Sequence, residues 1–273
     1  MMLAEVNDES PTGVEERDSG LRVFFASAIA RGRAAVRLVA FDPSLNCEPV
    51  EVSDEDWAER SQSSLEPVRV GRLVIAPGHD LGGRFLEQPP KTTSEITIII
   101  RPSMGFGTGH HASTRLCLRL LQDLSPSGAS VLDVGTGSGV LAIAAAKLGA
   151  LRVVAIDNDE DALRSARENV ELNSVGDVVV LRPVDLADFV GRTPQAAFDL
   201  VLANLTGAAL TRHAADLAAT LRPDGTLVVS GFESEEHNSI TQAFATLGLT
   251  PSGRGDEDGW AACSFRCEEL RLR

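Results

Sequence analysis

The chain has 273 residues, of which 43% are hydrophobic and 23% charged, so it predicts one large or two smaller folded domains with a substantial core. These values exclude wholesale disorder, a collagen-like structure and a small disulfide-stapled scaffold. The formal net charge of −14 argues against direct binding to nucleic acid, because affinity for phosphates comes largely from Lys and Arg. Two explanations of the charge stay open: a basic macromolecular partner, or solubility alone.

The apolar runs and the cysteines indicate the cellular compartment in which the protein is expected. No apolar run approaches the roughly 20 residues that span a bilayer, and the first 20 residues are acidic, so neither a membrane anchor nor a signal peptide is expected. The four cysteines lack the paired spacing of a zinc site. They are Cys47, Cys117, Cys263 and Cys267. We therefore expect free thiols, no bound metal and a cytoplasmic location.

The N-terminal quarter is predicted to hold a tail and a small module. Residues 1–20 are polar and predict a flexible tail. Residues 21–60 predict a small α/β module with three strand-like runs, Leu21–Phe25, Ala34–Phe41 and the shorter Pro49–Val52. The acidic segment Ser53–Glu55 is typical of a helix start.

A connector and a larger domain follow. Residues 61–95, with a strand at Val70–Ala76, are predicted to connect the module to a domain over residues 96–273 that begins with a strand at Ile96–Ile100. In that domain short apolar strands alternate with helical patterns. The strands are expected at Val131–Val134, Arg152–Ile156, Val178–Leu181, Leu200–Ala203 and Thr226–Ser230, and the helices at Val140–Leu148, Glu160–Leu172, Ala208–Leu221 and Glu235–Leu247. Such alternation predicts an α/β fold with a doubly wound, mostly parallel sheet. A C-terminal antiparallel hairpin is expected to close it, formed by Leu249–Arg254 and Trp260–Arg266.

The clearest motif is a strand that runs into a glycine-rich turn and then a helix. Its glycines, at every second position, are Gly135, Gly137 and Gly139. They allow a tight turn and let a ligand approach the backbone. A dinucleotide site prefers G-x-G-x-x-G, but Val140 stands where its last glycine would be, which favours S-adenosylmethionine over NAD. Asp133 would repel a pyrophosphate and can pair with the ammonium group of a methionine moiety; the alternative is a purely structural turn.

Acidic residues end the next two strands. Asp157 lies 22 residues after Gly135, where a carboxylate can accept hydrogen bonds from both ribose hydroxyls, and the alternative is that it only caps the following helix. Asp159 is expected to be that cap. Asp185 follows the third strand and is either a partner of an adenine amino group or a solvated loop residue.

The fourth strand ends at Asn204, at the point of the sheet where doubly wound folds bind substrate. An Asn carbonyl there, with neighbouring backbone carbonyls, can accept hydrogen bonds from an amine and aim its lone pair at a methyl group. Leu205 and Thr206 follow instead of the prolines found in methyltransferases that act on nucleic-acid bases, so a base is a less favoured acceptor. The alternative is that Asn204 only forms a turn.

A glycine-rich loop precedes the first helix of this domain. Phe106 and Thr108 stand between its glycines, followed by His110 and His111. Phe106 can form an apolar lid over a ligand. Adjacent histidines diverge and have no carboxylate or Cys at useful spacing, so a metal site is not favoured. His111 and Thr114 fit the polar wall of a small-molecule pocket, and the alternative is ordinary loop and helix-capping roles.

Taken together, these motifs resemble the ribosomal protein L11 methyltransferase (PrmA) family. The segments that carry the resemblance are Phe106–His111 with Ser113-Thr114, Asp133–Ile143 and Ala203–Leu205. The similarity extends from about Asp54 to the C-terminus and includes Asp56-Trp57 and Pro77. The chain departs from the family at Arg101-Pro102-Ser103 and Ser61.

The resemblance implies a Rossmann-like class I methyltransferase fold that uses S-adenosylmethionine to methylate amino groups, lysine side chains and the N-terminus, of a basic ribosomal protein, L11. A monomeric enzyme is expected. By position, Thr114, Gly135, Asp157 and Asn204 match the family's cofactor-contacting residues, and Phe106, Thr108 and His111 match its loop. Asn204 and Leu205 are the expected catalytic pair.

Within the resemblance, the small N-terminal module corresponds to a reduced substrate-recognition domain. Because this module is small, a lysine of a different protein stays open as the methyl acceptor. Two less favoured alternatives are an NAD-dependent oxidoreductase and a non-catalytic binding protein.

Overall fold

The computed structural model describes residues 11–17, 20–25, 28–42, 45–50, 66–78, 95–101, 110–192 and 197–267. The chain divides into two compact units, Met1–Trp57 and Ala58–Arg273. Within the described ranges, every helix is too short or too polar to cross a membrane. The helix start predicted at Ser53–Glu55 lies outside these ranges. So do the last two residues of the run predicted over Pro49–Val52, and its first two residues are not in a strand.

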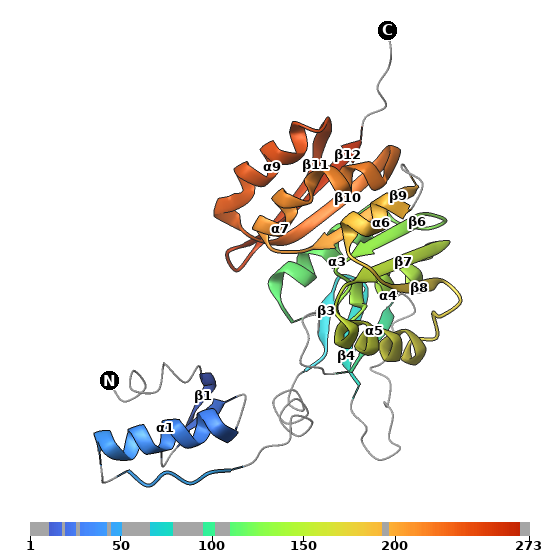
Figure 1. Cartoon of the computed structure of the whole chain (residues 1–273). Helices are drawn as coiled ribbons and strands as arrows, with labels where there is room; N and C mark the ends of the chain where they lie inside the picture. Colours follow the sequence, from blue (N-terminus) through green and yellow to red (C-terminus); the bar gives the residue numbers. More distant parts are fainter. Residues whose placement is uncertain are drawn as a thin grey trace. The chain divides into compact units, whose positions relative to one another are not determined.

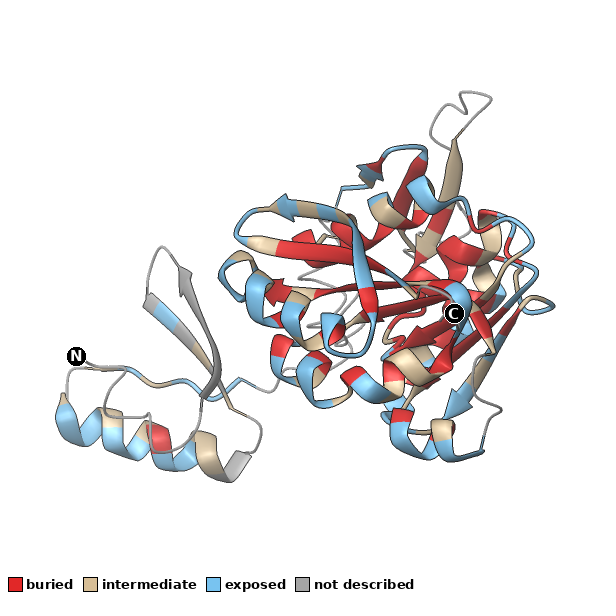
Figure 2. Cartoon of the chain, turned by 90° about the horizontal axis from the view of Figure 1, so that it is seen from above, coloured by how far each residue is buried: buried red, intermediate tan, exposed pale blue. Residues whose placement is uncertain are grey.

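The first unit contains a hairpin and a helix. Strand β1 (Pro11–Arg17) pairs antiparallel with β2 (Gly20–Phe25), and α1 (Ala28–Phe41) follows. Residues 11–17 are therefore a strand, and the prediction of a tail over residues 1–20 is wrong there. Among the described side chains of this unit Ala34 alone is buried, and Figure 2 shows α1 largely exposed.

The strand predicted over residues 34–41 is also wrong, because these residues form the second half of α1. The apolar run is rich in Ala, which has the highest helix propensity, whereas the prediction followed its valines. Val36 and Val39 do not form a buried strand face, since their exposed fractions are 71% and 41%.

A three-stranded sheet begins the second unit. Strand β3 (Val68–Val70) is antiparallel to β4 (Leu73–Pro77), which is parallel to β5 (Ile96–Ile100). Its side chains at Leu73 and Ile98 are fully buried and belong to the same core cluster as the helices beside the large sheet. The predicted connector over residues 61–95 is therefore, over residues 66–78, part of the folded core.

The large sheet has seven strands. They are β6 (Ser130–Val134), β7 (Arg152–Asp157), β8 (Val179–Pro183), β9 (Phe198–Asn204), β10 (Leu221–Glu233), β11 (Leu249–Glu257) and β12 (Trp260–Cys267). Their order across the sheet is β11-β12-β10-β9-β6-β7-β8, with β12 antiparallel to both of its neighbours (Figure 1). The order reverses between β6 and β9, which makes their carboxyl ends the topological switch point. This is the Rossmann-like class I methyltransferase fold.

Helices cover both faces of the sheet, because its central strands are apolar on both sides. Leu200 and Leu202 pack in one core cluster with residues of α3, α4 and α5, while Val201 and Ala203 pack in the other with residues of α6, α7, α8 and α9. These helices are α3 (Ala112–Leu124), α4 (Val140–Lys147), α5 (Glu160–Leu172), α6 (Leu186–Arg192), α7 (Gly207–Arg212), α8 (Ala214–Thr220) and α9 (His237–Ala245), the last preceded by the 3₁₀ turn η2 (Ser234–Glu236). Figure 2 shows the buried residues concentrated in the strands.

In the large sheet the predicted strands and closing hairpin, with the helices α4 and α5, are confirmed, most of them within one or two residues. The single strand predicted over Val70–Ala76 is wrong, because a turn at residues 71–72 divides it between β3 and β4. Two differences concern helices. The helix predicted over residues 208–221 is two helices that meet at His213, and α6 follows β8 where no helix was predicted. Asp185 accepts a hydrogen bond from the backbone N–H of Asp188 at 2.8 Å, so it caps the start of α6.

Candidate functional site

The glycine turn after β6 has the backbone that its sequence predicts. Gly135, Gly137 and Gly139 have φ angles of 67°, 54° and 82°, in the left-handed region that favours glycine. A Cβ atom at Gly135 would lie 2.5 Å from Cδ2 of Leu205. The turn after β6 and the residue after β9 therefore meet at the switch point, and only glycine leaves room for that contact.

Asp133 lies beneath this turn and is 1% exposed. Its Oδ2 accepts hydrogen bonds from the Thr136 hydroxyl at 2.6 Å and from the Ala142 N–H at 3.2 Å. Its Oδ1 is buried without a hydrogen-bond partner. Burial raises the pKa of Asp133 to about 6, and the negative charge of Asp157 adds to that rise while the two hydrogen bonds oppose it. A buried carboxylate oxygen with no donor is costly, and a cationic ligand group would relieve the cost.

Asp157 ends β7 and supports the same turn. Its Oδ2 accepts a hydrogen bond from the N–H of Gly137 at 2.9 Å, and its Oδ1 accepts one from the N–H of Asp159 at 3.1 Å. Asp159, as predicted, caps α5 by accepting a hydrogen bond from the N–H of Asp161. Each carboxylate oxygen of Asp157 can accept a further hydrogen bond, so its position is compatible with the predicted ribose contact.

A second group lies at the end of β9. The side-chain N–H of Asn204 donates to the Thr114 hydroxyl oxygen at 3.3 Å, which joins β9 to the first turn of α3. The N–H of Leu205 donates to the Ser230 carbonyl at 2.9 Å. Gly231, with φ 91°, lets β10 approach closely, because a Cβ there would lie 2.9 Å from Oδ1 of Asn204. Asn204 is therefore held between α3 and β10.

His111 forms the edge of the site at the start of α3. Its Nδ1 accepts a hydrogen bond from the Ser113 N–H, so it caps the helix, which is one of the two roles left open by the sequence. Its ring meets the ring of Trp260 edge to face, with 4.5 Å between centroids. His110 contacts the carbonyl of Glu66 through Nε2 at 3.0 Å. Phe106 and Thr108 lie outside the described residues.

The structure thus brings most of the predicted residues into one region. Asp133, Gly135, Gly137 and Asp157 are joined by the turn and its hydrogen bonds, and Thr114, Asn204 and Leu205 lie beside them through the contact of Leu205 with Gly135.

Sequence reasoning missed two contributors, Asn169 and Trp260. The Asn169 side chain is fully buried, donates to the Ser138 carbonyl at 2.8 Å and accepts from the Arg101 N–H at 2.8 Å. The sequence held one sign of this role, because Asn169 is a polar residue on the buried face of a predicted helix.

Comparisons with known proteins place these observations in a family. The family model described as ribosomal protein L11 methyltransferase (PrmA) matches residues 15–268. A ribosomal protein L11 methyltransferase of Chloroflexus aurantiacus is 42% identical over 236 residues, which cover 79% of this chain and 70% of that protein. The protein of the same name from Geotalea daltonii is 39% identical over 251 residues, which cover 88% of this chain and 75% of that protein.

Solved structures of other proteins are also similar to this chain. The crystal structure of a ribosomal protein L11 methylase from Lactobacillus delbrueckii subsp. bulgaricus is 27% identical, with a TM-score of 0.66, over 75% of this chain and 100% of that chain. A Burkholderia thailandensis 1,6-didemethyltoxoflavin-N1-methyltransferase is 21% identical, with a TM-score of 0.50, over 59% of this chain and 80% of that chain, and this likeness shows the fold alone. On the family match and the identity to its relatives, the chain belongs to the ribosomal protein L11 methyltransferase family.

Proposed function

We propose that this methyltransferase transfers methyl groups from S-adenosylmethionine to amino groups of ribosomal protein L11, on lysine side chains and the N-terminus. The observation that carries the proposal is the buried Asp133 beneath the glycine turn, next to the Asn204–Thr114 pair at the switch point. The names of the relatives support the acceptor.

The residues present fit the cofactor. The unpartnered Oδ1 of Asp133 suits a cationic group, and the glycine turn leaves the backbone open to a ligand. In the proposal Asp133 pairs with the ammonium group, Asp157 binds the ribose, and Thr114 and His111 line the wall. Phe106 and Thr108, outside the described residues, stay predicted cofactor contacts. The cofactor supplies a methyl group already activated by a sulfonium.

The chain's own residues then orient the acceptor. Asn204, held by Thr114 and packed on Gly231, offers its side-chain carbonyl with the backbone carbonyl of Leu205 as acceptors for the N–H groups of the amine. Holding both reactants in the productive geometry can supply roughly 7 to 11 kcal/mol in all, of which these two acceptors contribute a part. A lysine must first lose its proton to water, which at pH 7 costs roughly 5 kcal/mol for a pKa near 10.4. With the cofactor bound, its sulfonium methyl would pass to the free amine, the S–C bond breaking as the N–C bond forms, and the methylated nitrogen would release its second proton to water.

The acidic charge of the chain supports a basic protein partner and argues against direct nucleic-acid binding. All four cysteines are free thiols, which is compatible with a reducing cytoplasm. We propose a cytoplasmic monomer in which the first unit recognises the substrate.

The test uses purified protein, S-adenosylmethionine and free L11 from the same organism, with the product read by intact mass. We expect mass steps of whole methyl groups. Asn204→Ala should lower turnover by roughly 100-fold, because the amine loses its orientation, while affinity for S-adenosylhomocysteine measured by calorimetry changes much less. A variant that loses cofactor affinity and keeps turnover would refute the role of Asn204. An unchanged L11 mass beside measurable cofactor binding would point to a different protein lysine.

A further inference from the structure

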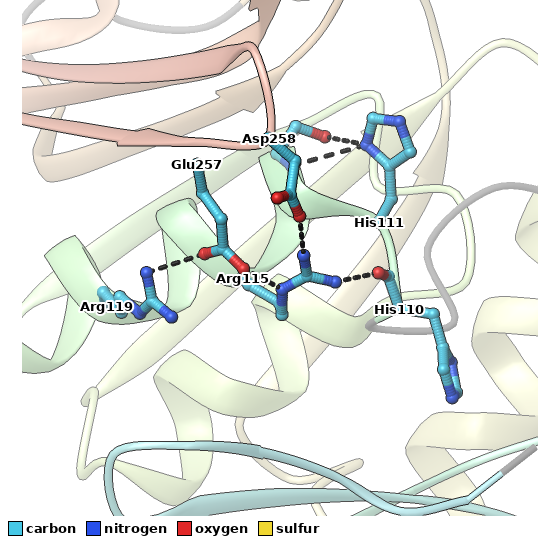
Figure 3. A network of polar contacts seen from close by, with 7 residues as sticks. His110, His111, Arg115, Arg119, Glu257 and Asp258 are labelled. Atoms are coloured by element: carbon cyan, nitrogen blue, oxygen red, sulfur yellow. Dashed lines mark hydrogen bonds and ion pairs between the residues drawn. The ribbon is translucent and has the colours of Figure 1, made fainter.

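One guanidinium group joins two parts of the sequence at the rim of the site. Nε of Arg115 lies 2.6 Å from Oε1 of Glu257, and its Nη2 lies 3.0 Å from Oδ2 of Asp258. Its Nη1 donates to the backbone carbonyl of His110. Figure 3 shows these three partners around Arg115. The helix α3 is thereby tied to the end of β11 and to the turn that leads into β12.

The same helical turn carries two other contacts of the site. His111 meets the ring of Trp260, the first residue of β12, and Thr114 accepts the hydrogen bond from Asn204. Trp260 and Asp258 also line a pocket of about 300 Å³ with Glu233, at the end of β10. The ion pairs of Arg115 therefore hold the hairpin turn where Trp260 reaches His111, next to the residue that contacts Asn204.

The environment of Arg115 distinguishes it from the next arginine on α3. The side chains of Arg115 and Glu257 are 19% and 20% exposed, whereas Arg119, whose Nη1 lies 2.6 Å from the other oxygen of Glu257, is 50% exposed. A planar guanidinium can donate to three acceptors in fixed directions, and the ammonium group of a lysine cannot. The contacts of Arg115 therefore require a guanidinium group. Because the Arg119 side chain is half exposed and makes one contact with Glu257, we expect it to contribute less than Arg115.

We propose that Arg115 is a positioning residue for methyl transfer: by fixing the β11–β12 turn against α3 it holds Trp260 on His111 and keeps the first turn of α3 aligned with Asn204. The inference rests on the proposed function for its catalytic consequence. Arg115 acts on methyl transfer from the rim of the site, through its contacts with Glu257, Asp258 and the His110 carbonyl.

The test uses Arg115→Lys, which keeps the charge, with Arg119→Gln as the matched control on the same helix. The chain has two Trp and no Tyr, so a Trp57→Phe background leaves Trp260 as the reporter of intrinsic fluorescence. His111→Ala in that background supplies the fluorescence of Trp260 without its partner ring. Each variant is also measured for affinity to S-adenosylhomocysteine by calorimetry and for kcat and KM with L11.

We expect Arg115→Lys to shift the Trp260 emission toward that of His111→Ala and to lower kcat roughly 10- to 100-fold, with cofactor affinity changed by less than about threefold. Arg119→Gln should stay within about twofold of the parent in every measurement. Wild-type emission and wild-type kcat in Arg115→Lys would overturn the inference, and so would an equal effect of Arg119→Gln. If the parent protein itself does not methylate L11, the proposed function fails, and the fluorescence comparison still decides whether Arg115 holds Trp260.

Discussion

Asp133 carries a cost to folding that its place in the site explains. Burial raises its pKa from the ordinary 3.8 to about 6, with Cys117 and Asp157 as the titratable groups that interact with it. Because the folded protein holds this proton more tightly than the unfolded chain, stability falls as pH rises from about 4 to about 6. The fall is 1.36 kcal/mol per unit of pKa difference, so above pH 6 the cost is roughly 3 kcal/mol.

Asp133→Asn should remove this cost. The Asn oxygen can still accept from Thr136 and Ala142, so we expect the variant to be up to roughly 3 kcal/mol more stable than wild type at pH 7.5, with the difference shrinking toward pH 4. Urea unfolding at several pH values measures it. The same variant should bind S-adenosylhomocysteine more weakly, because the charge that pairs with the ammonium is gone. A stability difference that does not change with pH would contradict the assignment.

Residues within one strand-turn-helix could be predicted, and residues brought together by folding could not. Asp133, Gly135 and Asp157 were predicted from their distance to a local turn, and the structure brings them together there. Thr114, the partner of Asn204, and Glu257, a partner of Arg115, lie 90 and 142 residues away from them, and no local pattern identifies these pairs. Burial also decides the pKa of Asp133, and a sequence does not display burial around a single carboxylate.

At the scale of elements, two asparagines, one within α5 and one at its C-cap, hold the three-stranded sheet against α5. Asn173 accepts from the N–H of Ile99 at 2.9 Å and donates to its carbonyl at 2.6 Å, which imitates a neighbouring strand for β5. Asn169 accepts from the Arg101 N–H just after β5 and donates to Ser138 in the glycine turn. Asn173 therefore stabilises β5 alone, whereas Asn169 joins the end of β5 to the glycine turn after β6.

This difference predicts two phenotypes. Asn173→Ala leaves two backbone groups of β5 without partners and should cost about 1 to 3 kcal/mol of stability with little change in affinity for S-adenosylhomocysteine. Asn169→Ala should cost a similar amount and also weaken that affinity roughly tenfold, because the Ser138 carbonyl loses its donor and the turn loses its support. Urea unfolding and calorimetry measure the two effects. Equal losses of affinity in both variants would refute the distinction.

Elements with a repeating pattern were predicted well, and those defined by context were not. The strands β6, β7 and β9 are buried on both faces, so their apolar runs are unambiguous. In contrast, the second half of α1 was predicted as a strand because residues 34–41 form an apolar run, although Val36 and Val39 are exposed on the helix. The short helix α6 has only seven residues, too few for a helical period to be recognised.

At the scale of the molecule, the site belongs to one unit. The described residues that form it all lie between residues 110 and 260, within Ala58–Arg273, and both core clusters lie within the same unit. If the first unit, Met1–Trp57, recognises the acceptor as proposed, cofactor binding and acceptor recognition can be separated by experiment.

A fragment of residues 58–273 should fold, because it retains both core clusters, and bind S-adenosylhomocysteine within about threefold of the full chain. It should methylate L11 at least roughly tenfold less efficiently, because binding energy from the first unit no longer helps to place the acceptor. Calorimetry and intact mass of L11 measure the two properties on the same samples. Equal methylation by fragment and full chain would show that the first unit does not recognise this substrate. A folded fragment without cofactor affinity would instead show that the first unit is needed to form the site.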